Sequence, residues 1–264
     1  MIDVALSRAD ARPAELAVVI DVLRATSTIA QALAAGYERV LCVDSVQRAR
    51  TLRAPGRMLA GERRCVMPPG FDLGNSPREM CERRGVELVL ATTNGTPAIV
   101  AARRHAPVVL LACMLNLSAV DAELARHDGG GDVSVQLVCA GRDGGVALED
   151  VYVAGRLAAA LPGPRTDATR IAEAVAASYR TPLDGLAAGS HAAILRKAAL
   201  ADDLAYCSRE STIEVVPVVE SGGEAIAVAV SADRAGAALA GARKGRPTNR
   251  CLPMNEPWKA LDSY

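Results

Sequence analysis

Aromatic residues are scarce in this chain of 264 residues, making up only 3% of it, and the acidic and basic residues balance at 30 each. Proteins that bind nucleic acids rely on basic surfaces and on aromatic rings that stack against bases. The composition therefore predicts that the chain binds no nucleic acid and that its partner is a small molecule.

Lysine is rarer still, since only Lys197, Lys244 and Lys259 are present. A Walker-type phosphate-binding loop needs a lysine between glycine and serine or threonine, so the first three-quarters of the chain cannot hold one. A dinucleotide-dependent oxidoreductase would need three spaced glycines after its first strand, whereas residues 24–28 contain none. Both nucleotide-binding classes are therefore disfavoured.

The sequence also lacks long hydrophobic runs and paired cysteines. Runs such as residues 108–111 fall far short of the roughly 20 apolar residues of a membrane helix. The first residues show no basic region followed by an apolar stretch, so no secretory signal is recognised. The seven cysteines are scattered and odd in number, which favours reduced thiols. We expect a cytoplasmic protein with no membrane segment.

What the chain has in quantity is aliphatic side chains, because half of its residues are hydrophobic. Short aliphatic runs alternate with alanine-rich segments of helical length, a pattern typical of parallel α/β proteins. The runs are apolar throughout, as expected when helices cover both faces of a sheet. We predict an α/β fold with three layers, α/β/α, and a largely parallel sheet whose strands lie at residues 16–20, 40–43, 57–60, 88–91, 108–112 and 133–138.

The C-terminal third has a different pattern. Residues 162–210 are mainly helical, and strand-like residues 213–219 and 225–230 predict a hairpin. We interpret residues 1–230 as a single α/β domain in which the helical segment 162–210 is either a lid or a contact between the subunits of a homodimer. Residues 231–264 turn to alanine, glycine and arginine and then to proline, which predicts a loosely packed tail.

Polar clusters follow most of the predicted strands. In an open parallel sheet the carboxyl ends of the strands lie at one edge, where ligands bind, so these clusters should converge. In chain order they contain Asp21, Arg24, Thr26 and Ser27, then Glu62, then Thr93, Asn94, Gly95 and Thr96, then Asn116, and finally Arg142, Glu149 and Asp150.

Each cluster taken alone has a structural interpretation. Asp21 could cap a helix, Thr26 and Ser27 could satisfy first-turn amides, and Asn94-Gly95 is a common turn. Five clusters together, rich in carboxylates, hydroxyls and arginine, favour a shared site. Oxygen ligands suit Mg²⁺ rather than zinc, and hydroxyls, glycine amides and helix N-termini suit phosphate. The pattern predicts metal-assisted hydrolysis of a small anionic phosphate ester.

The cysteines do not fit a thiol phosphatase. Cys42 and Arg48 have the Cys-x5-Arg spacing of such a loop, but residues 43–47 contain an acid and no glycine. We interpret Cys42 as a buried strand residue and Cys139, at a strand end, as a small core residue rather than a nucleophile.

Two long motifs carry a family resemblance: Asp21-Val22-Leu23-Arg24-Ala25-Thr26-Ser27-Thr28-Ile29 and Gly70-Phe71-Asp72-Leu73-Gly74-Asn75-Ser76-Pro77. Shorter matches occur at residues 61–63, 92–96, 138–141, 148–150 and 154–155, with fainter ones at 203–207 and 216–217. In these motifs, over about residues 3–230, the chain resembles the 2-phosphosulfolactate phosphatases. The resemblance implies an Mg²⁺-dependent enzyme that converts 2-phosphosulfolactate to sulfolactate, a step of coenzyme M biosynthesis.

Our hypothesis assigns a role to each cluster. Asp21, Glu62, Glu149 and Asp150 form an acidic pocket in which two or three bind Mg²⁺, while Asp21, Glu62 and Asp150 are the candidates to orient or deprotonate the attacking water. Arg24, Thr26, Ser27 and residues 93–96 hold phosphate, and Asn116 and Arg142 face the substrate's carboxylate or sulfonate.

Four alternatives stay open. Asp21 could attack phosphorus directly. The loop at Phe71 and Asp72 is either a lid or a structural loop. The chain could act on a different phosphorylated acid, or bind an anionic metabolite without catalysis.

Overall fold

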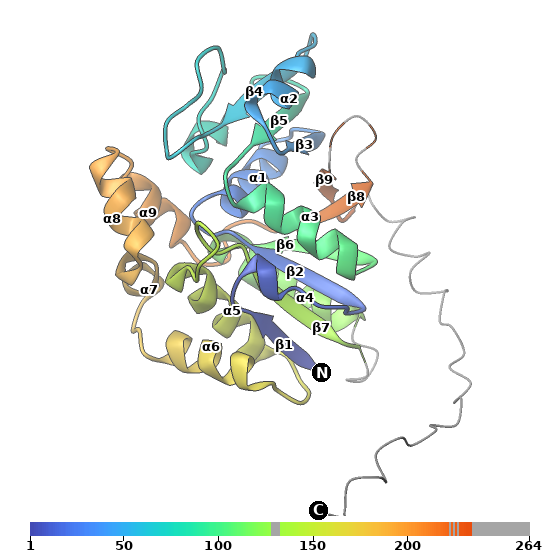
Figure 1. The fold of residues 1–264 in the computed structure, drawn as a ribbon, viewed down its shortest axis with the longest axis vertical. Coiled ribbons are helices and arrows are strands. Elements are labelled where there is room, and N and C mark those ends of the chain that lie inside the picture. The colour runs from blue at the N-terminus through green and yellow to red at the C-terminus, as the bar shows by residue number, and fades with distance from the viewer. Residues whose placement is uncertain (128–132, 222, 224, 226, 234–264) are drawn as a thin grey trace, which may run out of the picture.

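The computed structural model describes residues 1–264 except 128–132, 222, 224, 226 and 234–264. Within the described residues a nine-stranded sheet has the order β1-β7-β2-β6-β8-β9-β3-β5-β4 (Figure 1). The strands are β1 Ile2–Ala5, β2 Leu16–Ile20, β3 Arg39–Val43, β4 Arg57–Gly61, β5 Glu87–Ala91, β6 Val108–Ala112, β7 Val135–Cys139, β8 Pro217–Ser221 and β9 Ala227–Ser231. All six strands predicted from the aliphatic runs are present, whereas β1 was not predicted.

Helices cover both faces of this sheet. They are α1 Ala25–Ala34, α2 Val46–Thr51, α3 Gly95–His105, α4 Leu117–His127, α5 Leu148–Ala160, α6 Asp167–Ala177, α7 Pro182–Ala188, α8 Ser190–Lys197 and α9 Asp202–Cys207, with 3₁₀ turns at Arg8–Asp10, Pro77–Met80 and Met114–Asn116. Side chains of α1 and α3 pack into one apolar core, and those of α4, α5 and α6 into the other. The predicted three-layer α/β/α architecture is therefore confirmed.

Strand β2 is apolar throughout because both of its faces are buried. In β2, Val18 and Ile20 belong to one core, while Ala17 and Val19 belong to the other. All five residues of this strand are buried. Alternate side chains of a strand point to opposite faces, so a strand between two helical layers needs apolar residues at every position.

The C-terminal hairpin is confirmed, and it lies inside the sheet. Strands β8 and β9 pair antiparallel with each other, β8 pairs antiparallel with β6, and β9 pairs antiparallel with β3. The hairpin thus joins two parallel groups of strands, β1-β7-β2-β6 and β3-β5-β4. The predicted tail, residues 231–264, lies outside the described residues from residue 234 onward.

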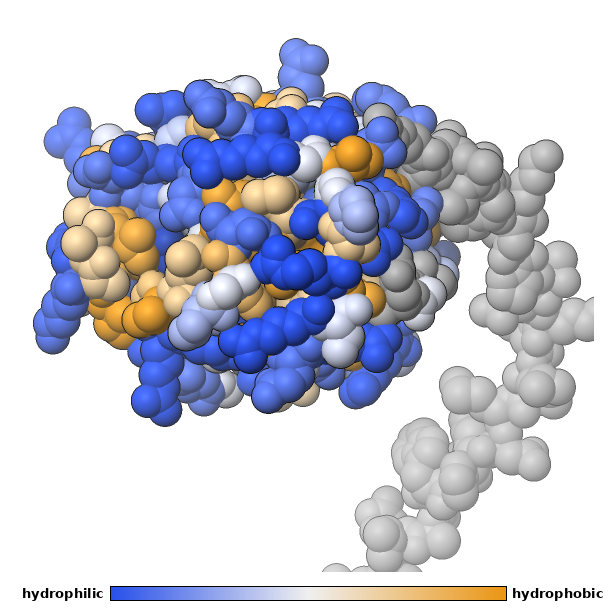
Figure 2. Space-filling view, turned by 90° about the horizontal axis from the view of Figure 1, so that it is seen from above, coloured by the Kyte–Doolittle hydropathy of each residue, from blue (hydrophilic) through white to orange (hydrophobic). Residues whose placement is uncertain are grey.

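The segment 162–210 is helical, as predicted, and contains α6 to α9. Figure 1 shows α7, α8 and α9 grouped at the left of the molecule, beside the ends of the strands. Seen from above, the molecule carries mostly hydrophilic residues with hydrophobic ones scattered among them (Figure 2). None of the described helices is long and apolar enough to cross a membrane.

The register of the sheet aligns the strand ends. Ile20, the last residue of β2, lies opposite Ala112 of β6 and Cys139 of β7. In the other parallel group, Ala91 of β5 lies opposite Gly61 of β4. Because the strands of each group end level with one another, the polar residues that follow them emerge at the same edge of the sheet.

Candidate active site

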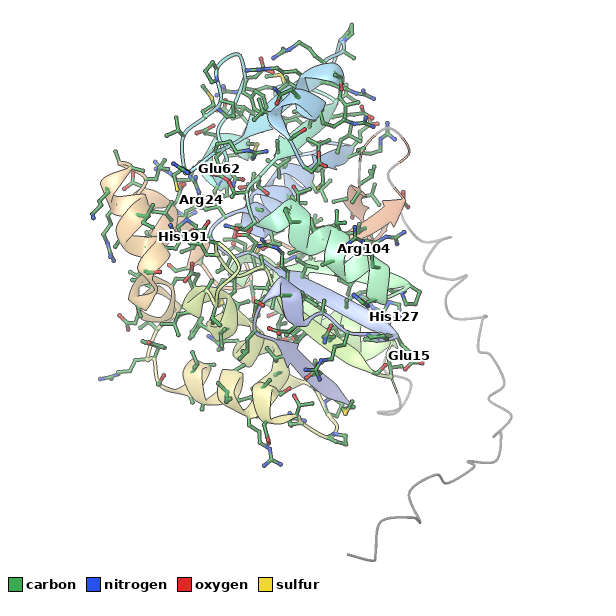
Figure 3. All side chains as sticks on the ribbon, in the orientation of Figure 1. Glu15, Arg24, Glu62, Arg104, His127 and His191 are labelled. Atoms are coloured by element: carbon green, nitrogen blue, oxygen red, sulfur yellow. The ribbon has the colours of Figure 1, made fainter. Side chains whose placement is uncertain are left out.

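A cavity of about 420 Å³ opens at the carboxyl edge of the sheet. Arg24, Glu62 and His191 gather at this end of the strands, and Glu15, Arg104 and His127 lie at the opposite end (Figure 3). The lining comes from both parallel groups and from α8: Asp21, Leu23, Arg24, Glu62, Arg64, Cys65, Asn75, Thr92, Thr93, Asn94, Arg142, Asp143, His191 and Ile194.

Asp21 is a buried carboxylate that lines the cavity. It directly follows β2, only 8% of it is exposed, and its Oδ1 accepts a long hydrogen bond of 3.4 Å from the Ala25 amide. Burial raises the pKa of Asp21 to about 6, against the favourable charge of His191. The Asp21 amide donates to Thr26 Oγ1 at 3.2 Å, so Thr26 shapes the loop around this carboxylate.

The N-terminus of α3 lies against Asp21. Gly95 is the first residue of this helix, and a Cβ on it would lie 2.7 Å from Asp21 Oδ2 and collide with the side chain of Ala25. Only glycine allows the two chain segments to approach so closely. Thr93 and Asn94, just before the helix, line the cavity. The positive end of α3 therefore faces the carboxylate and the cavity.

Glu62 connects the loops that follow β4 and β5. Its Oε1 accepts hydrogen bonds of 2.9 Å from both the amide and the hydroxyl of Thr93. Its Oε2 accepts from the Cys65 amide at 2.9 Å. Glu62 also lines the cavity, and its position is set by loops from two strands.

His191 enters the cavity from α8 between a thiol and a carboxylate. Its Nε2 lies 3.8 Å from Cys65 Sγ, and its Nδ1 lies 3.3 Å from Glu149 Oε1. Burial disfavours the imidazolium, but the contacts with Cys65 and Glu149 and the charge of Asp21 outweigh it and raise the pKa of His191 to about 10. The cavity therefore holds a cation that balances part of its acidity.

Asp150 interacts with Asp21 but is not among the residues that line the cavity. Its Oδ1 accepts from the Val22 amide at 3.0 Å, and its Oδ2 accepts from the Gly141 amide at 3.2 Å. Burial, together with the charges of Asp21 and Glu149, raises the pKa of Asp150 well above its usual range. The carboxyl group thus joins the loops after β2 and β7.

Two arginines among the predicted binding residues line the cavity and have carboxylate partners. Arg24 Nη1 lies 2.6 Å from Asp203 Oδ2, and both side chains are buried. Asp203 Oδ1 also accepts from the Ser76 hydroxyl at 2.6 Å. Arg142 Nε lies 3.4 Å from Asp143 Oδ2 in the loop after β7.

The other predicted binding residues lie outside the cavity lining. The Ser27 hydroxyl donates to the Val22 carbonyl at 2.8 Å, and the Thr96 hydroxyl lies 3.3 Å from that of Thr92. The side-chain amide of Asn116 bonds three backbone groups within the protein. The structure therefore gives Thr26, Ser27, Thr96 and Asn116 bonds that hold the loops in place, and it brings Thr93, Asn94, Arg24 and Arg142 to the cavity.

The two cysteine assignments are confirmed. Cys42 and Cys139 are buried in strands, and burial raises the pKa of the Cys42 thiol to about 12. At residues 71–72 the structure favours the structural-loop alternative, because Phe71 packs in the core, Asp72 Oδ2 accepts from the Leu59 amide at 2.7 Å, and neither residue lines the cavity.

The donor set at the cavity fits an open magnesium site better than a closed cage. Within the described part of the chain no group of three or more Asp, Glu, His or Cys side chains is arranged to hold a metal ion. Mg²⁺ in phosphate-handling sites is commonly held by one or two carboxylates, with waters and substrate oxygens completing its shell. Asp21 and Glu62 line the cavity and provide such a pair, whereas Glu149 and Asp150 are not among its lining residues.

Sequence reasoning missed His191, Arg64, Cys65 and Asp203. His191 and Asp203 belong to the helical segment 162–210. This segment contains no predicted strand whose end would indicate a site residue. Asp203 did carry a signal, since it begins one of the fainter matching stretches, residues 203–207. Arg64 and Cys65 follow Glu62 in a turn whose backbone φ angles, +54° and +66°, are not evident from these residue types.

Comparison with known proteins identifies the family of the chain. The 2-phosphosulpholactate phosphatase family model matches residues 4–222. A protein of Pseudothermotoga lettingae named probable 2-phosphosulfolactate phosphatase is 39% identical over 220 residues, covering 83% of this chain and 95% of that protein. Proteins of the same name from Thermus thermophilus and Deinococcus radiodurans are 38% and 37% identical, covering 80% and 81% of this chain and 91% and 92% of their own lengths. The chain therefore belongs to the 2-phosphosulfolactate phosphatase family of phosphoric monoester hydrolases.

Proposed function

We propose that this chain hydrolyses 2-phosphosulfolactate to sulfolactate and phosphate with the assistance of Mg²⁺. One observation carries the proposal: the buried Asp21 carboxylate lies against the first residue of α3 in a cavity that arginines also line. A carboxylate, a helix N-terminus and guanidinium groups together can activate, bind and neutralise a phosphate ester.

The phosphate group binds at the N-terminal end of α3. The amides there carry partial positive charge, and the Thr93 and Asn94 side chains line the same wall. Arg24 and Arg142 contribute charge to the cavity, and Asp203 holds the Arg24 guanidinium in place. Preorganised donors of this kind stabilise the charge that develops on the equatorial oxygens during phosphoryl transfer.

Asp21 and Glu62 are the residues that would hold Mg²⁺, because both face the cavity. When bound, Mg²⁺ supplies positive charge that offsets the repulsion between the carboxylates and the phosphate dianion. Glu149 would orient His191 through the contact at Nδ1, and Asp150 would keep the Asp21 loop in position through the Val22 amide.

Asp21 is the reacting carboxylate in either of two routes. In the first route it accepts a proton from the water that attacks phosphorus while the bond from phosphorus to the ester oxygen breaks. In the second it displaces the ester oxygen itself, forming an acyl phosphate that water then hydrolyses to phosphate and the free carboxylate. In both routes the departing alkoxide takes up a proton, so that sulfolactate leaves as the alcohol. The two routes differ in stereochemistry, since one displacement inverts a chiral phosphorus and two displacements retain its configuration. Hydrolysis of an ester with an isotopically chiral phosphate group would distinguish them.

The test is a phosphate-release assay on small phosphorylated acids, with Mg²⁺ and with excess chelator. We expect phosphate release from 2-phosphosulfolactate that chelation abolishes and Mg²⁺ restores. Binding of the ester without release of phosphate would show a non-catalytic binding module. Full turnover in chelator would contradict the role of Mg²⁺, and faster turnover of another phosphorylated acid would replace the substrate while keeping the reaction.

A further inference from the structure

Over the residues that the structure describes, three of the four cationic side chains that line the cavity have an ion-pair partner. Arg24 is paired with Asp203 at 2.6 Å, Arg142 with Asp143 at 3.4 Å, and His191 with Glu149 at 3.3 Å. Arg64 also lines the cavity, but it has no hydrogen-bond or ion-pair partner among the described residues. Its charge is available to a ligand.

The backbone holds Arg64 in an unfavourable conformation. Arg63 and Val66 exchange backbone hydrogen bonds of 2.9 and 3.1 Å, which closes a tight turn with Arg64 and Cys65 at its centre. Both central residues have positive φ, +54° and +66°, where glycine or asparagine is preferred. The Cys65 amide donates to Glu62, so the turn is fixed to the floor of the site.

A second turn, at the same edge of the sheet, can be compared with the turn at Arg64. Arg142 and Gly145 exchange backbone hydrogen bonds of 2.9 and 2.8 Å, and the central residues are Asp143 and Gly144 with φ of +50° and +83°. This turn has the usual Asp-Gly sequence. The turn at Arg64 has the same shape without glycine, and residues kept in such conformations cluster at ligand sites.

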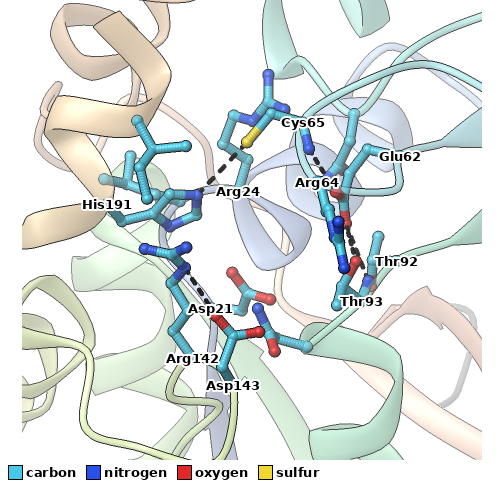
Figure 4. Close-up of a pocket in the computed structure, with 14 residues that line it drawn as sticks. Asp21, Arg24, Glu62, Arg64, Cys65, Thr92, Thr93, Arg142, Asp143 and His191 are labelled. Carbon is cyan, nitrogen blue, oxygen red and sulfur yellow. Dashed lines mark hydrogen bonds and ion pairs between the residues drawn. The ribbon is translucent and has the colours of Figure 1, made fainter. Parts of the chain in front are cut away.

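Arg64 lies on the side of the cavity opposite His191 and Arg142. Figure 4 shows Arg64 with Glu62 and Thr93 on one side, His191 and Arg142 on the other, and Asp21 between them in this view. A volume of about 420 Å³ accommodates a small organic acid and not only its phosphate group. A ligand whose phosphate lies beside Asp21 therefore has room to extend a second group towards Arg64.

We propose that Arg64 binds a second acidic group of the substrate, a carboxylate or a sulfonate, and selects phosphate esters that carry one. The inference rests on the proposed function and adds the residue that determines which phosphate esters are selected. A guanidinium without a protein partner gains a charge-assisted, bidentate hydrogen bond from such a group, but only a single, weaker hydrogen bond from a neutral hydroxymethyl. Selection arises because only the acidic ester makes the bidentate bond in the transition state.

Three esters with one carbon skeleton test the proposal. Glycerol 2-phosphate, 2-phosphoglycerate and 2-phosphosulfolactate carry no, one and two acidic groups besides the phosphate. We expect Arg64→Gln to lower kcat/KM by about tenfold or more for an ester with the recognised group and to leave glycerol 2-phosphate within about twofold. A loss that begins with 2-phosphoglycerate identifies the carboxylate, and a loss confined to 2-phosphosulfolactate identifies the sulfonate.

Two variants serve as controls. Arg64→Lys keeps the charge but not the planar fork, so it should restore part of the preference. Arg104→Gln removes one positive charge at the opposite end of the strands (Figure 3) and should change none of the three rates. An equal change for all three esters in Arg64→Gln, with or without a lower melting temperature, would overturn the proposal, because an effect on the turn alone cannot distinguish the esters.

The role of Arg64 can also be tested if the proposed phosphatase function fails. If the wild type releases phosphate from none of the esters, calorimetry measures their binding to the wild type and to Arg64→Gln. Weaker binding of 2-phosphosulfolactate, but not of glycerol 2-phosphate, to the variant supports the role of Arg64. Equal loss, or no loss, for both esters refutes it.

Discussion

Replacing Asp21 by asparagine removes one charge from the cavity while keeping the size and most of the hydrogen bonding of the side chain. From the structure we expect this variant to lose activity but to keep its stability. Activity should fall, because Asp21 lies at the cavity against the N-terminus of α3. Stability should not fall, because burial opposes the ionisation of this carboxyl group.

The size of each effect follows from this position. If Asp21 reacts or binds metal, turnover should drop by at least about a hundredfold, which is about 2.7 kcal/mol of transition-state stabilisation. The pKa of Asp21 is raised from 3.8 to about 6, so the folded state binds its proton more tightly than the unfolded chain does. Stability is then lost as pH rises from about 4 through about 6, by at most about 3 kcal/mol.

The assay combines turnover with melting. In metal-free buffer at pH 8, Asp21→Asn should melt at the same temperature as the wild type or higher, and at pH 4 the two should coincide. Phosphate release with Mg²⁺ is measured on the same preparations. Asp167→Asn, an exposed change at the first residue of α6, is the matched control and should leave turnover unchanged.

Two results would refute this reasoning. Near-normal turnover in Asp21→Asn would show that the side chain merely shapes the loop, which asparagine can do about as well. A melting temperature well below that of the wild type at pH 8 would show that the carboxylate stabilises the fold, contrary to the effect of its burial.

Three further variants test the surroundings of the site. Gly95→Ala should lower turnover by about tenfold or more, because its Cβ would press on Asp21 Oδ2 at 2.7 Å and small displacements of a reacting group are costly. Cys42→Ala should leave kcat unchanged in a phosphate-release assay, because this thiol is buried and its pKa is raised to about 12. Asp203→Asn should lower the free energy of unfolding by about 3 kcal/mol in a urea titration, because Arg24 would stay buried without a counter-charge.

Each of these variants has an outcome that contradicts its premise. Full activity in Gly95→Ala would mean that the α3 N-terminus can move away from Asp21 without consequence. Loss of turnover in a stable Cys42→Ala protein would restore the thiol-nucleophile interpretation. Unchanged unfolding of Asp203→Asn would show that Arg24 finds another partner, and the double variant with Arg24→Gln measures the coupling between the two residues.

The layers and most of the strands could be predicted from the sequence. The run at residues 16–20 is apolar at every position because Val18 and Val19 point into different cores, and this two-sided burial is visible in the sequence. The strand β1 was missed because it has only four residues, one of them Asp3. Its identity depends on pairing with β7, which is remote in sequence.

The placement of the hairpin could not be predicted. Its residues 217–221 and 227–231 read as two adjacent strands, and that local pattern is the same at the edge of a sheet as in its interior. Insertion between β6 and β3 depends on backbone hydrogen bonds with strands more than a hundred residues earlier in the chain. Long-range pairing of this kind leaves no periodic signal.

The sequence by itself determined the chemistry of the edge: Asp21, Glu62 and Thr93 follow predicted parallel strands, and the carboxyl ends of such strands must meet. Only the tertiary structure decided which of the predicted polar groups face the cavity. The side chains of Asn116 and Ser27, for example, form hydrogen bonds with backbone groups instead. The tertiary structure also brought in His191 from a distant helix. The physical reason is that sequence position sets which edge a residue reaches, whereas burial and available partners set whether its polar atoms stay free for a ligand.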